Sequence, residues 1–307
     1  MKISVEQAIA QAKSSFKRGD FGAAKELYQN ILQTFPHNKR AKRGLAEVLR
    51  NQRKVPQNSI KSEVDRLGQM YNKGNFSSVI KAANSIIKHS PKEVSIWEVL
   101  GAAHRGLGNI KEALAAFKKV VELNPNYAAG HNNLGVAFQD QGKYEDSVEC
   151  FTKALSLKSN YAEAYNNLGN SFKDQGNLEK AIAAYEKAIS CKLDYSAAYS
   201  NKGRALHENN NLEKADYALK KSISINPKNF SAYNNLGLLH KDQGKINEAI
   251  NSFEQAIALN RNFINAHLNL STLRKYRSGD PQINIVDGLL SKSNLSEHDR
   301  SRLLYVS

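Results

Sequence analysis

A period of 34 residues runs through most of this 307-residue chain and constrains its fold more than any other feature. Aromatic or histidine residues recur at this step: Trp97, His131, Tyr165, Tyr199, Tyr233 and His267. Each of the first five is followed, three residues later, by a pair of residues that ends in glycine: Leu100-Gly101, Leu134-Gly135, Leu168-Gly169, Lys202-Gly203 and Leu236-Gly237. Such a period is typical of stacked units that each bury an apolar face only against their neighbours. It therefore predicts an elongated array rather than one compact core.

A small residue and a large residue, four positions apart, also recur in every period. The small ones are Ala113, Ser147, Ala181, Ala215 and Ala249, and the large ones are Phe117, Phe151, Tyr185, Leu219 and Phe253. A small side chain lets two helices approach closely, and a large one fills the groove beside them. With the period, this pattern resembles the tetratricopeptide repeat family. The resemblance implies an all-α fold, a right-handed superhelix of about seven helix-turn-helix repeats with a C-terminal capping helix and a short helical tail.

The junctions between helices carry their own signals. The first helices end at glycines, which tolerate left-handed backbone: Gly108, Gly142, Gly176 and Gly244. In one repeat Asn210 replaces the glycine. Prolines stop some of the second helices: Pro36, Pro91, Pro125 and Pro227. We expect a degenerate N-terminal repeat (5–38) plus an extra helix within residues 1–50, a hinge at 51–59, an array at 60–277 and a helical tail at 278–307. The array divides into repeats 60–93, 94–127, 128–161, 162–195, 196–229 and 230–263 and a cap at 264–277.

Composition limits the class of protein. The net charge is +15, and residues 1–61 hold thirteen Lys or Arg against four Asp or Glu. A charge run of this kind is more often a solvated helix face, and no nucleic-acid module accompanies it, so nucleic-acid binding is not expected. No apolar run is long enough for a signal peptide or a spanning helix, which predicts a cytoplasmic protein with no membrane insertion. Cys150 and Cys191 are expected to be small core residues.

One face of the first helices carries a row of asparagines. We number the places of each repeat from its first residue, so that the sixth place is Asn133, Asn167, Asn201, Asn235 and Asn269. The row resembles the asparagine ladder of the O-linked N-acetylglucosamine transferase superhelix, which implies a concave groove for a peptide. An amide can pair with the N–H and C=O groups of an extended chain without reading its sequence. The alternative is that these asparagines were copied with the repeat and merely face water.

A row of acidic residues accompanies the asparagines at the thirteenth place: Asp140, Asp174, Glu208 and Asp242. If the row is unpaired, it favours guests that contain Lys or Arg. Neighbouring lysines could instead neutralise it as solvated surface pairs: Lys143, Lys173, Lys241 and Lys245. Both interpretations stay open at this point.

Signals of catalysis are missing from the sequence. It has no glycine-rich phosphate loop and no nucleophile elbow, and its eight histidines show no metal-type pairing, so we expect no enzyme activity, cofactor or metal. His131 and His267 stand where the motif has an aromatic residue, and His104 and His240 occupy an eleventh place that normally packs in the core. All four are interpreted as structural.

The C-terminal part carries a second resemblance. Residues 267–283 and 295–305 are similar to the segment that joins the repeats to the catalytic domain in bacterial tetratricopeptide-repeat sulfotransferases. This suggests an alternative to a protein or peptide-binding scaffold, namely the substrate-recruiting arm of a transferase whose catalytic domain is absent from this chain. An exposed C-terminal end would also favour a homo-oligomer.

Overall fold

The computed structural model describes residues 4–52, 57–274, 281–291 and 301 of the chain. Within these ranges every element is a helix and no strand occurs, which confirms the all-α prediction. The chain divides into two compact units, residues 1–82 and 83–307, and the boundary falls within α5 (Phe76–Ile87). The expected hinge at 51–59 includes residues 53–56, which lie outside the described residues.

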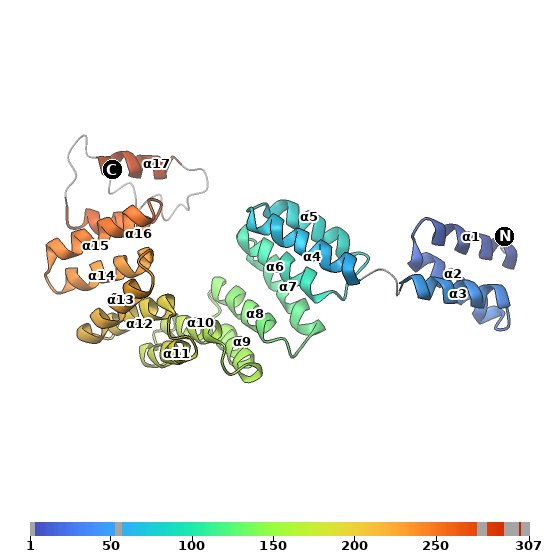
Figure 1. Ribbon diagram of the computed structural model, residues 1–307, viewed down its shortest axis with the longest axis horizontal. Coiled ribbons are helices and arrows are strands. Elements are labelled where there is room, and N and C mark those ends of the chain that lie inside the picture. Colours follow the sequence, from blue (N-terminus) through green and yellow to red (C-terminus); the bar gives the residue numbers. More distant parts are fainter. Residues whose placement is uncertain (1–3, 53–56, 275–280, 292–300, 302–307) are drawn as a thin grey trace. The chain divides into compact units, whose positions relative to one another are not determined.

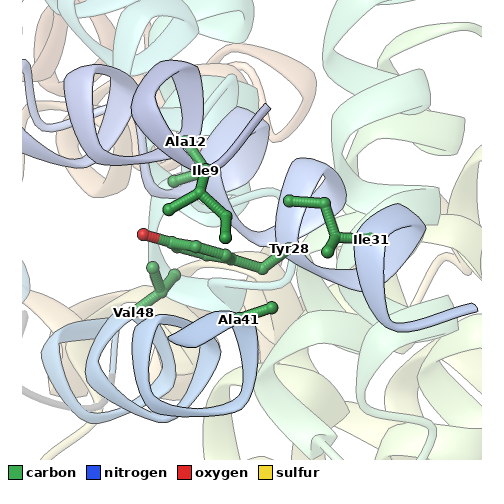
Figure 2. Packing of buried hydrophobic residues seen from close by; sticks show 7 residues of the cluster. Ile9, Ala12, Tyr28, Ile31, Ala41 and Val48 are labelled. Atoms are coloured by element: carbon green, nitrogen blue, oxygen red, sulfur yellow. The ribbon is translucent and has the colours of Figure 1, made fainter. Parts of the chain in front are cut away.

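The first unit begins with four helices that precede α5: α1 (Val5–Lys17), α2 (Phe21–Thr34), α3 (Lys39–Gln52) and α4 (Gln57–Asn72). The core of α1 to α3 is built around Tyr28, whose ring lies between side chains of α1 and α3 (Figure 2). A Cβ on Gly44 of α3 would lie 2.3 Å from Tyr28 Cζ, so α3 can pack this closely only because residue 44 has no side chain. The helix after the first repeat is therefore part of the same core.

The second unit continues with a stack of antiparallel helix pairs (Figure 1). The pairs are α6 (Val94–Gly106) with α7 (Ile110–Leu123), α8 (Ala128–Asp140) with α9 (Tyr144–Leu157), α10 (Ala162–Asp174) with α11 (Leu178–Cys191), α12 (Ser196–Glu208) with α13 (Leu212–Ile225), and α14 (Phe230–Asp242) with α15 (Ile246–Leu259). Each first helix has 13 residues and each second helix has 14. All five pairs therefore begin and end at the same places of the 34-residue repeat.

Close packing inside each pair follows from the glycine of the motif and the large residue of the second helix. At Gly237, for example, a Cβ would lie 2.6 Å from Phe253 Cε1, and Phe253 is completely buried. First helices also pack on the next first helix, from α8 through α16 (Ile264–Ser271), whereas neighbouring second helices pack less closely. The stack is therefore tighter on its first-helix side, which makes that side the inner face of the superhelix.

The end of the described array is covered by α17 (Pro281–Leu290). Its buried Val286 and Leu289 pack against Ile264 and Leu268 of α16. The second tail helix, expected after Ser296, lies outside the described residues. The apolar side of α16 is thus occupied by the chain itself.

The two cysteines differ in their surroundings. Cys150 is half-buried beside Leu114 and Ala137, and burial raises the pKa of its thiol to about 12. Cys191 is exposed, so its interpretation as a core residue was wrong. It is the last residue of α11, where the side chain faces solvent instead of the neighbouring helix.

Candidate functional site

The ladder asparagines lie at matching positions on five successive first helices of the second unit. α8, α10, α12, α14 and α16 each contribute one, and every one of them is half-buried. The position recurs because the sixth place falls on the side of the helix that meets the preceding first helix. The structure therefore brings all five residues into one row along the inner face.

Each ladder amide is tied to the preceding repeat by a hydrogen bond that spans 35 residues. The Nδ2 atom donates to the side chain at the fifth place of the previous first helix. The pairs are Asn133 with Glu98 Oε1 (3.0 Å), Asn167 with Asn132 Oδ1 (3.1 Å), Asn201 with Asn166 Oδ1 (2.9 Å), Asn235 with Ser200 Oγ (3.3 Å) and Asn269 with Asn234 Oδ1 (2.9 Å). The row is thus a chain of inter-repeat contacts as well as a surface.

This bond fixes the ladder side chains and leaves part of their capacity unused. An amide has two N–H donors and an oxygen that accepts two hydrogen bonds, and the inter-repeat bond uses a single donor. The fifth-place partners Asn132, Asn166, Ser200 and Asn234 are all at most 7% exposed, so each bond is anchored from the buried side. The inter-repeat bond therefore leaves one N–H group and the oxygen of each ladder amide outside it, although Asn133 Oδ1 also accepts from Asn132 Nδ2 at 3.5 Å.

The acidic row is largely paired with basic residues of the protein itself. Asp140 binds Arg105, Asp174 binds Lys173 at 2.5 Å, Glu208 binds Arg204 at 2.8 Å, and Asp242 contacts His207 at 2.9 Å. Gln139 also donates to Asp174 at 3.4 Å. These exposed pairs contribute little to stability, about 0 to 1 kcal/mol each. The three pairs with arginine or lysine offset negative charge that the row would otherwise present to a guest.

Sequence reasoning missed most of these basic partners. Of the lysines that it considered, Lys173 forms a pair with the acidic row, whereas Arg105, Arg204 and His207 were not considered. A signal was available in two cases. Arg105 and His207 lie 35 residues before their partners, the same interval that separates the two members of each ladder bond.

A cluster at the first rung of the ladder was also missed. Glu98 accepts hydrogen bonds from Asn133 Nδ2 at 3.0 Å and from the Tyr127 hydroxyl group, at 3.0 Å to Oε2 and 3.2 Å to Oε1. Burial raises the pKa of the Glu98 carboxyl, and the two hydrogen bonds oppose that rise. Burial and the adjacent carboxylate raise the pKa of Tyr127 to about 12, so this phenol is neutral at ordinary pH. Here the fifth-place partner carries a charge.

The histidines have structural surroundings. His104 and His240 are half-buried, as expected, and His267 is completely buried with Nε2 2.9 Å from the carbonyl oxygen of Arg261. His131 Nε2 and Trp97 Nε1 make the corresponding contact with a proline carbonyl six residues earlier, each at 2.8 Å.

The part of the chain that the structure describes holds no group of three or more His, Cys, Asp or Glu side chains that could bind a metal ion. It also contains no helix with the length and hydropathy needed to span a bilayer.

Family models match repeats in several parts of the chain. Models of the tetratricopeptide repeat match residues 15–57, 126–194 and 230–263, and a further model of this repeat matches residues 101–142 and 203–244. Comparison with curated protein sequences gave no match.

Two solved structures with TM-scores of 0.60 or more show the same fold. The chain resembles the APC/C hetero-tetramer Cut9-Hcn1 with a TM-score of 0.62 and 16% identity, over 99% of this chain and 56% of that one. A tetratricopeptide repeat protein from Parabacteroides merdae gives a TM-score of 0.60 and 15% identity, over 87% of this chain and 97% of that one. MamA is 31% identical over 53% of this chain and 95% of its own, with a TM-score of 0.46.

Proposed function

The chain belongs to the tetratricopeptide repeat family, and from this premise we propose that it is a scaffold that binds an extended protein segment along the inner face of its second unit. The observation that carries the proposal is the row of five oriented amides. A free amide on a surface must lose rotamer entropy when it binds, but these side chains are already held by the preceding repeat. Preorganisation of this kind favours binding.

The spacing of the row suits an extended chain. Neighbouring helices pack about 8 to 10 Å apart, and an extended chain advances about 3.3 Å per residue. One amide therefore meets the guest at about every third residue, and five amides correspond to about twelve residues. Since the amides contact backbone groups, the guest is defined by being unfolded rather than by a fixed sequence. No residue of the chain is assigned a catalytic role.

The transferase-arm alternative uses the same face. It rests on the resemblance of residues 267–283 and 295–305 to the joining segment of repeat-sulfotransferases. In this case the bound segment would be the substrate of a catalytic domain outside these 307 residues. A transferase reading frame that continues from or neighbours the gene would support this alternative, and its absence would leave the scaffold proposal.

The test separates binding by the ladder from its structural role. Phage-displayed random peptides of about twelve residues are selected on the wild type, and the affinity of a selected peptide is measured by fluorescence polarisation. The first variant, Asn167→Ala/Asn201→Ala/Asn269→Ala, removes three ladder amides. The matched control, Asn132→Ala/Asn166→Ala/Asn234→Ala, removes the same three inter-repeat hydrogen bonds but keeps the ladder amides.

We expect the ladder variant to bind the peptide about tenfold more weakly or worse, since each lost hydrogen bond costs about 0.5 to 1.5 kcal/mol. The control loses the anchoring bonds but keeps the ladder amides, so its loss of affinity should be clearly smaller than that of the ladder variant. Circular dichroism melts establish that both variants fold. Equal losses in the two variants, or a library that yields no peptide on the wild type, would show that the ladder is only structural.

A further inference from the structure

A tyrosine occupies the last place of three successive repeats and precedes the next first helix. Tyr127, Tyr161 and Tyr195 are all half-buried. In two of the three, a lysine three residues earlier lies over the ring: Lys158 Nζ is 4.6 Å from the Tyr161 centroid, and Lys192 Nζ is 5.3 Å from the Tyr195 centroid. These distances fall within the range of cation–π attraction. The fold therefore places a cation over this ring in two repeats.

Tyr127 is the exception. Asn124 stands where the other two repeats have lysine, and among the described side chains no lysine or arginine lies over the Tyr127 ring. The backbone is the same in the three repeats, with φ and ψ of −139° and 85° at Asn124, −142° and 93° at Lys158, and −146° and 98° at Lys192. A lysine would thus fit at residue 124, but the sequence does not supply one.

The carboxylate beside Tyr127 is a second exception at the same junction. Glu98 lies 29 residues before Tyr127, and the residues at this interval before Tyr161 and Tyr195 are Asn132 and Asn166. Relative to the next two repeats, this junction has therefore lost a positive charge and gained a negative one. Tyr161 interacts electrostatically with both Glu98 and Tyr127, and its side chain is not cationic.

We propose that the Glu98 carboxylate and the Tyr127 ring form a site for the ammonium or guanidinium group of a lysine or arginine side chain. The ring supplies the face that two neighbouring repeats fill with their own lysines. The carboxylate supplies the countercharge and retains acceptor capacity, because its present partners are one hydroxyl group and one amide. This inference extends the proposed function, since Asn133, the first rung of the ladder, is bonded to the same Glu98.

The structural alternative is that Glu98 only connects Tyr127 and Asn133 across the repeat junction. A test must therefore remove the charge and keep the connection. Glu98→Gln does so, because a glutamine oxygen can still accept from the hydroxyl group and the amide. A second variant, Asn124→Lys, places the protein's own cation over the ring and should block the site from within.

The probes are the N-acetyl methylamides of lysine and arginine, with that of norleucine as the uncharged control. Binding is followed by NMR through the side-chain amide of Asn133 and the ring of Tyr127, and thermal melts establish that the variants fold. We expect saturable shifts with both cationic probes and none with norleucine. Glu98→Gln should weaken binding by about fivefold or more because it removes the countercharge. Asn124→Lys should have an effect of similar size because its own ammonium group occupies the ring face.

Equal shifts with norleucine, undiminished binding by Glu98→Gln, or no shift on the wild type would each overturn the inference. The probes have no extended backbone and do not require the ladder. Failure of this titration therefore leaves the ladder proposal standing, whereas failure of the peptide selection overturns the ladder proposal alone.

Discussion

Single residues decide how acid affects this fold, and His267 is the clearest case. It is completely buried, and burial lowers the pKa of its imidazole below the ordinary value near 6.5, although the contact with the Arg261 carbonyl oxygen opposes the shift. The unfolded chain therefore takes up the proton at a higher pH than the folded chain. As pH falls through the unfolded value, His267 subtracts from the free energy of unfolding.

We predict that His267→Phe reduces this acid sensitivity. Phenylalanine keeps the packing but does not titrate, so the variant should lose less free energy of unfolding than the wild type between about pH 7.5 and about pH 5.5. It should be less stable at both pH values, because the hydrogen bond to residue 261 is gone. Urea unfolding at the two pH values measures the difference. An unchanged difference would mean that other groups, such as His104, whose pKa burial also lowers, dominate the response.

The row of asparagines shows what single-residue patterns can and cannot predict. Their common face could be predicted, because places 34 residues apart repeat the same helical position. Their hydrogen bonds could not, since these depend on how far one first helix is rotated against the next. The one available signal was chemical, because every fifth-place residue from Glu98 to Asn234 carries a side-chain acceptor. The cluster of Glu98 with Tyr127 was missed for the same reason.

At the scale of helices, the ends of the second helices in the array recur with the 34-residue period. Second helices that precede a proline, such as α7, and those without one, such as α9, end at the same place of the repeat. The C-cap residue has similar backbone angles in both cases, and its N–H group donates to the carbonyl four residues earlier. Proline is therefore not required for termination of the second helices.

The turn inside each helix pair requires left-handed backbone, as predicted. Gly176 has φ of +78°, and Asn210, with φ of +56°, is the only non-glycine residue of the described chain with positive φ. A Cβ at Gly176 would meet no atom within 4 Å, so a substitution there changes the backbone energy alone. A substitution at Gly176 therefore tests conformational strain without a change in packing.

We predict that Gly176→Ala lowers the free energy of unfolding by about 1 kcal/mol, because alanine pays the cost of left-handed backbone. Asn210→Gly, the matched change in the next repeat, should raise it slightly, by about 0.5 kcal/mol or less. Urea denaturation of both variants provides the measurement. A neutral Gly176→Ala would mean that the turn adopts another conformation.

At the scale of the whole chain, two compact units contain repeats of the same family. The array in the second unit could be predicted from the sequence because its motif is nearly regular. The covering of α16 could not, since Val286 and Leu289 belong to a segment outside the repeat pattern. This contact bears on self-association, because the apolar side of α16 is available to a second copy only when α17 leaves it.

We predict that Val286→Asp/Leu289→Asp displaces α17 and promotes self-association. Both side chains are buried, so a charge at either position opposes packing on Ile264 and Leu268. Sedimentation velocity over a concentration series should show a larger species than in the wild type. Asn284→Asp, at an exposed position of the same helix, adds charge without removing the contact and should leave the distribution unchanged. A wild-type distribution in the double variant would contradict the prediction.

The hydrogen bond between consecutive repeats also limits how an array of this kind can change in length. Each unit from α8 to α14 brings both a donor at its sixth place and an acceptor at its fifth. A cassette of 34 residues can therefore be spliced in or excised, and the new neighbours will find a matching partner. A splice of any other size would misalign every rung beyond it, so the reach of this face is adjustable only in whole steps.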